Sequence, residues 1–304
     1  MRDNLASGSP AGKDLLQGPI GVVGLGRMGA GIAGRLASQG LDVLGYDLDS
    51  DKMRDAPFSV TDDPTEIGRH SRTVLFSLPR AEHLQPAIGS IAGGDILNLE
   101  PGLCLIDMGT SLPAVQQDVA RMLGERGIDF LDAPVSGGPS AANDGTLLIM
   151  VGGSATAVER ARPVLELAGR VVLHIGPIGS GTVVKLLNNG ILAAAVLAAG
   201  EAVTLASHHG IEPADLLTAL SAGSARGYAV DEVIRRHVSG EVTQPRFTFE
   251  QLLKDVNYLD TAFRGDFHES SVFPATVSAL SDVVARGHGS IDFGATAPWG
   301  RDRH

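Results

Sequence analysis

Residues 20–36 read IGVVGLGRMGAGIAGRL, and this stretch decides how the first half of the chain folds. The apolar run at 20–23 is too short for a typical helix and predicts a buried strand. Gly24, Gly26 and Gly29 follow it in the spacing G-x-G-x-x-G and open a helical segment. Such glycines permit a tight turn, backbone access for a pyrophosphate and close helix packing, so the motif predicts dinucleotide binding. Taken alone, it is also compatible with a glycine-rich turn that binds nothing.

An acidic residue further along the chain favours the dinucleotide. The next apolar run, 43–46, ends before Asp47, about 20 residues beyond the loop, where a ribose-binding carboxylate is expected. A carboxylate at that place would repel a 2′-phosphate, and no arginine follows it directly. We therefore expect NAD as the cofactor, with NADP less favoured. Lys52 and Arg54 lie further on and are expected on a solvated helix face.

Short apolar runs alternate with helical segments through the first half of the chain. The runs lie at 20–23, 43–46, 74–77, 104–107, 130–131, 147–151 and 171–175, with helical segments at 30–39, 112–126 and 155–167. This alternation is typical of βαβ units with a parallel sheet. After GPIGSG (176–181) the chain is helix-forming, and no convincing strand pattern returns.

These patterns predict an α/β Rossmann domain at residues 19–180 and an all-α domain at 181–304, joined by a long central helix. Residues 1–18 are expected to form a flexible extension. The segment 191–199 is apolar on every side, so this part of the helix is expected to be buried. We expect no segment long and apolar enough to span a membrane, because the most apolar stretch, 191–199, is too short and Glu201 follows it. Residues 1–19 lack the apolar core of a secretory signal.

Composition excludes several classes of protein. Hydrophobic residues make up 43% of the chain, which is enough to fill a core and excludes disorder. Acidic residues outnumber basic ones by 35 to 24 without a basic run, so nucleic acid is a poor partner. The single cysteine excludes a disulfide framework and a cysteine-rich zinc site, and it favours the reducing cytoplasm. The histidines do not cluster, so we expect no metal.

Lys185 and Asn189 are candidates for chemistry because they share one face of the predicted helix. Apolar neighbours would desolvate the amine of Lys185 and lower its pKa towards neutrality. An ordinary lysine at a helix start is the competing interpretation, but Lys185 also follows a predicted domain boundary, where ligand sites are common.

Two further segments carry polar groups. Ser136, Gly137 and Gly138 form a small turn whose backbone N–H groups could hold a carboxylate, although alone it is simply a turn. Lys254 and Asp255 follow an apolar stretch, and alone they predict a surface ion pair.

Four motifs together resemble those of the β-hydroxyacid dehydrogenase family, which includes 3-hydroxyisobutyrate dehydrogenase and tartronate semialdehyde reductase. They are GLGRMGAGIAGRL (24–36), DAPVSGGPSAANDGTL (132–147), GSGTVVKLLNN (179–189) and FEQLLKD (249–255). They occur in the family's order and spacing, and the resemblance covers residues 20 to 292.

The resemblance implies roles for individual residues. Lys185 would be the catalytic lysine, and the substrate would be bound by Ser136, Gly137, Gly138 and Asn189. Cofactor contacts would come from Gly24, Leu25, Gly26, Arg27, Met28, Gly29, Asp47, Leu78, Pro79, Thr110 and Lys254.

Two features bear on substrate preference. Gly109 replaces the serine or threonine that the family usually carries before Thr110, which removes a hydroxyl near the nicotinamide. The region around Arg226 and Tyr228 borders the substrate pocket in the family, so these side chains could recognise an additional polar or acidic group. A surface arginine on a loop is the equal alternative.

The sequence therefore predicts an NAD(P)-dependent oxidoreductase that interconverts a short-chain 3-hydroxy acid and its semialdehyde or keto acid, with a lysine general acid/base. One alternative is an imine reductase-like enzyme on the same fold, against which Lys185 and Asp47 argue. The other is a non-catalytic dinucleotide-binding protein, against which the joint presence of Lys185, Asn189 and the Ser136 turn argues. The apolar helix and the family both imply a homodimer or homotetramer.

Overall fold

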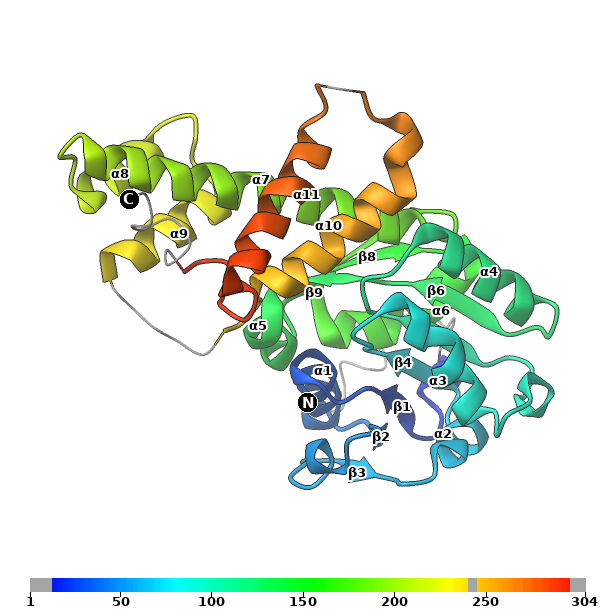
Figure 1. The fold of residues 1–304 in the computed structure, drawn as a ribbon. Coiled ribbons are helices and arrows are strands. Elements are labelled where there is room, and N and C mark those ends of the chain that lie inside the picture. Colours follow the sequence, from blue (N-terminus) through cyan, green and yellow to red (C-terminus); the bar gives the residue numbers. More distant parts are fainter. Residues whose placement is uncertain (1–12, 240–244, 269, 296–304) are drawn as a thin grey trace. The chain divides into compact units, whose positions relative to one another are not determined.

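The structure, a computed structural model, describes residues 13–239, 245–268 and 270–295. The chain divides into two compact units, Met1–Lys185 and Leu186–His304, which we describe separately (Figure 1). The sequence suggests a boundary near residue 180, whereas the division falls between Lys185 and Leu186, inside helix α7 (Ser180–His208). One continuous helix therefore carries the chain out of the first unit.

The first unit is built on a nine-stranded sheet. Six parallel strands lie in the order β3-β2-β1-β4-β5-β6, followed by β8, which is antiparallel to β6. Strand β7 pairs antiparallel with β8, and β9 pairs parallel with it. The strands are β1 (Ile20–Val23), β2 (Val43–Tyr46), β3 (Ser59–Val60), β4 (Thr73–Phe76), β5 (Cys104–Asp107), β6 (Asp129–Asp132), β7 (Val135–Ser136), β8 (Leu147–Gly152) and β9 (Gly169–Gly176). This is the doubly wound arrangement, and its strand order reverses between β1 and β4.

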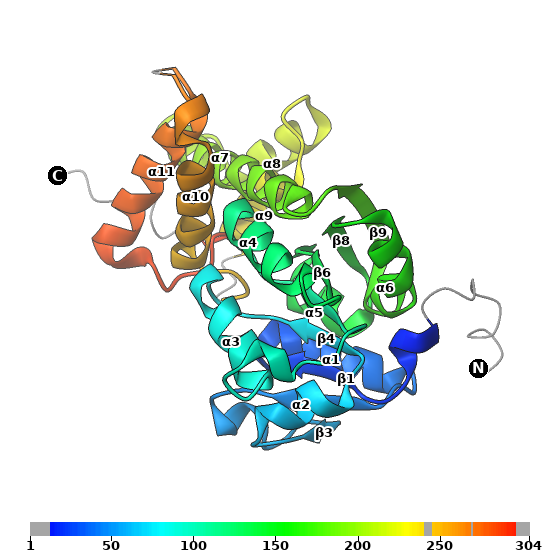
Figure 2. The same ribbon diagram turned by 90° about the vertical axis from the view of Figure 1, so that its right-hand side faces the viewer.

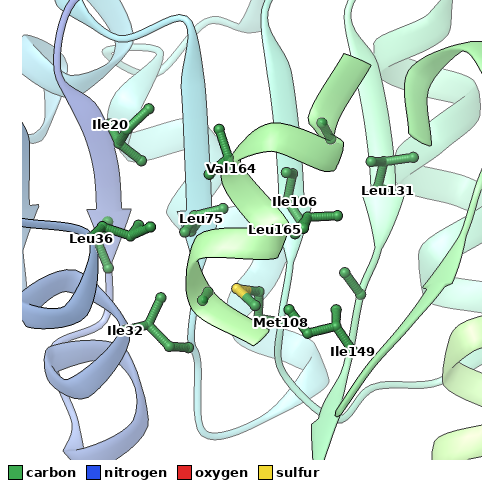
Figure 3. Close-up of a cluster of buried hydrophobic side chains, with 14 of the residues drawn as sticks. Ile20, Ile32, Leu36, Leu75, Ile106, Met108, Leu131, Ile149, Val164 and Leu165 are labelled. Atoms are coloured by element: carbon green, nitrogen blue, oxygen red, sulfur yellow. The ribbon is translucent and has the colours of Figure 1, made fainter. Parts of the chain in front are cut away.

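Helices cover both faces of this sheet. Helices α1, α5 and α6 pack on one face, and α2, α3 and α4 on the other (Figures 1 and 2). The first three share one buried cluster of side chains with the strands, and the other three share a second. Figure 3 shows Ile32 and Leu36 of α1 beside Val164 and Leu165 of α6, together with Leu75 of the sheet. The helices are α1 (Arg27–Ser38), α2 (Pro64–His70), α3 (Leu84–Ile91), α4 (Pro113–Gly124), α5 (Gly138–Asp144) and α6 (Ala155–Ala168).

All seven predicted strands are present, and the predicted α/β fold followed by a helical unit is confirmed. The near-continuous apolar runs arise because each parallel strand is buried on both faces. Cys104 illustrates this position: it is fully buried in β5, and burial raises the pKa of its thiol to about 12.

The predicted extension is only partly within the described residues. Residues 1–12 lie outside them, but Lys13–Leu16 form a 3-10 turn. Leu15 is buried there, and its carbonyl accepts a hydrogen bond of 2.9 Å from the Thr73 hydroxyl. Arg160 also donates to Asp14 at 2.7 Å. From residue 13 onward the chain is therefore packed against the first unit and is not a loose extension.

The second unit is helical in its described part, apart from one isolated bridge between Thr248 and Asp292. Its buried cluster includes Val196 of α7, Val233 of α9, Phe249 of α10 and Leu280 of α11. The helices that follow α7 are α8 (Pro213–Ala222), α9 (Tyr228–Ser239), α10 (Phe249–Phe263) and α11 (Val272–Val283).

Two expectations about α7 are wrong. The helix is not buried on every side, because Ile191 is 64% exposed and Leu205 is 59% exposed. The helix has 29 residues, and an 18-residue stretch of it has a mean hydropathy of 1.7, so α7 is long and apolar enough to cross a membrane by length and composition, contrary to the expectation that no segment is. The face that includes Val196 and Ala199 packs into the helical cluster, which accounts for the apolar composition.

Candidate active site

The carboxyl ends of four neighbouring parallel strands bring the predicted cofactor residues to one edge of the sheet. Val23 at the end of β1 is in register with Tyr46 of β2 and with Phe76 of β4. Phe76 is in turn in register with Asp107 of β5. The segments that follow these strand ends carry Gly24, Asp47, Leu78 and Thr110. The point where the strand order reverses, between β1 and β4, is where doubly wound folds bind nucleotides.

The three loop glycines have different physical roles. Gly24 has a φ of +93°, and a Cβ there would lie 2.4 Å from the Ser77 carbonyl oxygen. A Cβ on Gly29 would lie 1.9 Å from the Gly24 oxygen. At Gly26, no atom other than those of the glycine and its two chain neighbours lies within 4 Å of the Cβ position. The chain itself therefore requires glycine at 24 and 29, whereas glycine at 26 leaves open space beside the loop.

The start of α1 offers donors to that space. Its N-cap is Gly26, and no side-chain hydrogen bond caps the helix there. The first N–H groups of a helix have no acceptors within the helix itself. Backbone donors at a helix N-terminus, together with open space at a glycine, suit a pyrophosphate. The residues present therefore fit the dinucleotide that the motif predicts.

Asp47 is tied directly to this loop. Its Oδ2 accepts a hydrogen bond of 2.7 Å from the Leu25 N–H, and its Oδ1 accepts one of 2.9 Å from the Asp49 N–H. The Lys52 Nζ lies 3.3 Å from Oδ1. Lys52 belongs to a 3-10 turn, Ser50–Lys52, so the expected solvated helix face is not present there. Asp47 thus stands next to the glycine loop, although Lys52 partly offsets its charge.

The turn that carries Thr110 is held by a buried carboxylate. Asp107, which is 3% exposed, accepts hydrogen bonds from the Gly109 N–H at 2.9 Å and from the Gln116 Nε2 at 2.6 Å. A Cβ on Gly109 would lie 3.0 Å from the Asp107 Oδ1 and 3.2 Å from the Leu78 carbonyl oxygen. The space at position 109 is therefore tight, which agrees with glycine in place of the serine or threonine that the family usually carries.

The turn at Ser136 connects β7 to α5. Ser136 is half-buried, and both Gly137 and Gly138 have positive φ, at +133° and +74°. Apart from its chain neighbours and the backbone of its own helix, no atom lies within 4 Å of a Cβ placed on Gly138. The turn therefore presents its backbone to open space, as a carboxylate-binding turn requires.

Lys185 is half-buried in α7, one turn beyond the residues with which the helix contacts the sheet. Asp132 at the end of β6 accepts hydrogen bonds from the Gly179 and Thr182 N–H groups, each at 2.7 Å. Asp132 is fully buried, and desolvation raises its pKa from 3.8 to about 6 although those two N–H groups act to lower it. The start of the helix that carries Lys185 is thus capped from the sheet.

In the second unit, a buried carboxylate joins two predicted residues. Asp255 Oδ2 accepts a hydrogen bond of 2.6 Å from the Asn189 Nδ2, and the Lys254 Nζ lies 2.9 Å from Asp255 Oδ1. Asn189 is 1% exposed and Asp255 is 2% exposed. The simple surface ion pair that Lys254 and Asp255 suggest in the sequence is therefore wrong, because its acidic member is buried and orients Asn189.

The sequence gives no role in the site to Asp107 or Asp132, and it suggests only a surface ion pair for Asp255. Each follows or ends an apolar segment beside a predicted site residue, and that position was the available signal. Arg226 lies in the exposed segment before α9, and Tyr228 is 66% exposed. Within the described residues, no three His, Cys, Asp or Glu side chains gather as a metal site would require.

A cavity of about 320 Å³ lies at the opposite ends of the strands. Gly18, Arg72 and Leu103 line it, and they directly precede or lie near the starts of β1, β4 and β5. Ligands of doubly wound folds bind at the carboxyl ends. We therefore assign this cavity no part in the candidate site.

Family models match both units. Residues 19–176 match the NAD-binding domain of 6-phosphogluconate dehydrogenase. Residues 179–296 match the NAD-binding domain of NADP-dependent 3-hydroxyisobutyrate dehydrogenase. The two matches together cover the motifs described above.

Individual relatives agree with these models. The chain is 31% identical to 2-(hydroxymethyl)glutarate dehydrogenase of Eubacterium barkeri, over 90% of each chain. It is 33% identical to NAD-dependent L-serine dehydrogenase of Pseudomonas aeruginosa, over 90% of this chain and 95% of that one. The 3-hydroxyisobutyrate dehydrogenase of Mycobacterium tuberculosis with L-serine is similar in structure, with a TM-score of 0.83, 26% identity and coverage of 92% and 98%. The chain therefore belongs to the β-hydroxyacid dehydrogenase family of NAD(P)-binding oxidoreductases.

Proposed function

We propose that the protein is an NAD-dependent dehydrogenase that interconverts a short-chain 3-hydroxy acid and its semialdehyde or keto acid. One observation carries the proposal: Asp47 accepts a hydrogen bond from the Leu25 N–H and so lies beside the glycine loop. Both lie at the edge of the sheet where the strand order reverses, between β1 and β4. That edge also carries Leu78 and Thr110, which the family motifs assign to the cofactor.

The dinucleotide, when bound, supplies the hydride chemistry. The protein's own residues bind the acid and move one proton. The backbone N–H groups of Ser136, Gly137 and Gly138 hold the substrate carboxylate, and Asn189 contributes a further polar contact. Lys185 takes the proton of the substrate hydroxyl as general base, and in the reverse direction it returns that proton.

The surroundings of Asp47 support NAD over NADP. Asp47, Asp49 and Asp51 place three carboxylates in this segment, and Arg54 forms its ion pair with Asp51. Lys52 is the other cation of the segment 47–54, and its Nζ already lies 3.3 Å from Asp47 Oδ1 and 3.9 Å from Asp49 Oδ2. A 2′-phosphate would therefore enter a net negative environment, whereas ribose hydroxyls could donate to Asp47.

The relatives suggest a narrower substrate class. L-serine and 2-(hydroxymethyl)glutarate both carry a hydroxymethyl group on the carbon next to a carboxylate, as 3-hydroxyisobutyrate does. The three compounds differ only in the other substituent of that carbon. We therefore propose a 3-hydroxypropanoate core, with the substituent as the feature that this protein selects.

A cofactor-reduction assay tests the proposal. The purified protein is given NAD or NADP with 3-hydroxyisobutyrate, L-serine, 2-(hydroxymethyl)glutarate, glycerate, threonate and 3-hydroxypropionate. We expect reduction of NAD with at least one acid and weaker reduction of NADP. Turnover with NADP alone would overturn the interpretation of Asp47. Turnover of cyclic imines without any hydroxy acid would favour the imine reductase, and tight NAD binding without turnover would favour the non-catalytic protein.

A further inference from the structure

The first turn of α7 is capped by a residue far away in the sequence. Helices leave their first N–H groups without partners inside the helix, and these are usually capped by a side chain just before it. Here the cap is Asp132, the last residue of β6, which accepts from the N–H groups of Gly179 and Thr182 at 2.7 Å. One carboxylate therefore joins the sheet to the helix start.

Two glycines make this contact close. A Cβ on Gly152 of β8 would lie 2.2 Å from the Asp132 Oδ1. A Cβ on Gly181 of α7 would lie 2.2 Å from the Met150 carbonyl oxygen and 3.0 Å from the Asp132 carbonyl oxygen. The helix start consequently rests directly on the backbone of β6 and β8. Lys185 lies four residues after Gly181 and so shares its helix face.

Stability alone does not explain the carboxylate. Asp132 is fully buried, and the rise of its pKa to about 6 shows that desolvation outweighs the two N–H bonds. At neutral pH the charged form is thus held in the fold against its preference for water. A serine or threonine could cap a helix without that penalty, whereas a carboxylate holds two N–H groups in fixed directions at once.

We propose that Asp132 is a positioning residue for Lys185. Its carboxylate fixes the first turn of α7 on the sheet and thereby fixes the position of the backbone from which the Lys185 side chain extends. The proposal rests on the proposed role of Lys185 as general acid/base. It adds a residue that acts through the helix backbone and does not touch the substrate.

The test is Asp132→Asn, which keeps the size of the side chain but offers a single acceptor oxygen. We expect kcat on the best hydroxy acid to fall roughly tenfold to a hundredfold, because a small misplacement of a catalytic group has that effect. The affinity for NADH should stay at the wild-type value, because the glycine loop is unaltered. Amide hydrogen exchange at residues 179–185 should become faster.

Ser154→Ala is the matched control. Ser154 caps α6 by accepting from the Ala157 N–H at 3.1 Å, and that helix carries none of the predicted site residues. Its loss should lower the melting temperature and leave kcat unchanged. Equal loss of kcat in both variants would overturn the proposal, because general destabilisation would then explain the effect.

Gly152→Ala provides an independent perturbation if Asp132→Asn does not fold. Its methyl group would occupy the place of the Asp132 carboxylate, so it should lower kcat and speed exchange at 179–185 in the same way. If either variant folds and its amide exchange at residues 179–185 equals that of the wild type, the proposal is overturned whatever the activity. Full activity of Asp132→Asn, measured beside an active wild type and an inactive Lys185→Ala, would also overturn the proposed role of Asp132. That result would leave the proposed function standing. If the wild type lacks turnover, the proposed function fails, while the exchange data still decide whether Asp132 holds the helix.

Discussion

Buried carboxylates organise the candidate site at the level of single residues. Asp107 holds the turn before Thr110, Asp132 holds the first turn of α7, and Asp255 orients Asn189. Each is at most 3% exposed, so each accepts its hydrogen bonds in a medium where they are strong. The polar groups assigned to the reaction thus have partners that restrict their directions.

Replacement of Lys185 by alanine should remove the proton-transferring group and little else. We expect kcat to fall by roughly 10²- to 10⁴-fold, the range typical of a lost general acid/base. The affinity for NADH, measured by fluorescence titration, should not change. Lys185→Arg is the matched variant: it keeps the positive charge but holds its proton too tightly, so it should not restore turnover. Wild-type turnover in either variant would contradict the role.

The raised pKa of Asp132 predicts a pH-dependent stability. Between pH 3.8 and about 6 the folded state binds a proton that the unfolded state has lost, so this contribution to stability is complete at low pH and is lost as pH rises. The full loss corresponds to about 3 kcal/mol, to order of magnitude. Urea unfolding of the wild type and Asp132→Asn should therefore show the stability of the wild type, relative to the variant, falling from pH 4 to pH 7. A constant difference would contradict the shift.

At the level of elements, we predict that the β1–α1 turn holds one glycine needed for folding and another needed for binding. Gly26→Ala should leave the melting temperature unchanged, because its methyl group meets no atom within 4 Å apart from its chain neighbours. It should nevertheless weaken NADH binding at least tenfold, since the methyl group would occupy the space expected for the pyrophosphate. Gly24→Ala should instead lower the melting temperature, because φ is +93° and the Ser77 oxygen lies 2.4 Å from the new Cβ. Thermal unfolding and NADH titration of both variants check this, and equal NADH affinity of Gly26→Ala and wild type would contradict it.

The regular elements of the first unit follow from the sequence because each strand is buried on both faces and reads as an apolar run. The two strands that were not predicted, Ser59–Val60 and Val135–Ser136, have only two residues each. No periodicity exists over two residues, so only pairing with β2 and β8 defines them. The burial of α7 was predicted wrongly for a similar reason: its composition gives no sign of which face its neighbours cover.

For the molecule as a whole, we predict a homodimer or larger homo-oligomer that uses the exposed face of α7. Leu187, Ile191 and Leu205 remain 38%, 64% and 59% exposed on that helix. Ile191→Glu should shift the mass measured by light scattering towards the monomer, because it places a charge within an apolar contact. Val272→Glu is the control, since Val272 is also 64% exposed but lies on α11. A wild-type monomer, or an Ile191→Glu oligomer of wild-type size, would contradict the prediction.

The site could be predicted from the sequence where its residues fall in continuous motifs, and not where contacts join distant segments. The glycine loop and Asp47 are predicted to share the cofactor because Asp47 follows the next strand at the spacing of about 20 residues that the motif requires. The contacts of Asp132 with Thr182 and of Asn189 with Asp255 span 50 and 66 residues. No local pattern encodes such pairs. The roles given to Lys185 and Ser136 stay predictions until activity is measured.

The burial of Cys104 has a consequence for experiments on this protein. It is the single cysteine of the chain, and at neutral pH its thiol stays protonated inside β5. Because the thiolate is the nucleophile, a maleimide finds no reactive thiol in the native protein. A cysteine introduced at Leu48, which is 90% exposed beside Asp47, would thus be the only residue to take a fluorophore. Nucleotide binding can therefore be followed with a fluorophore at position 48 without first removing the natural cysteine.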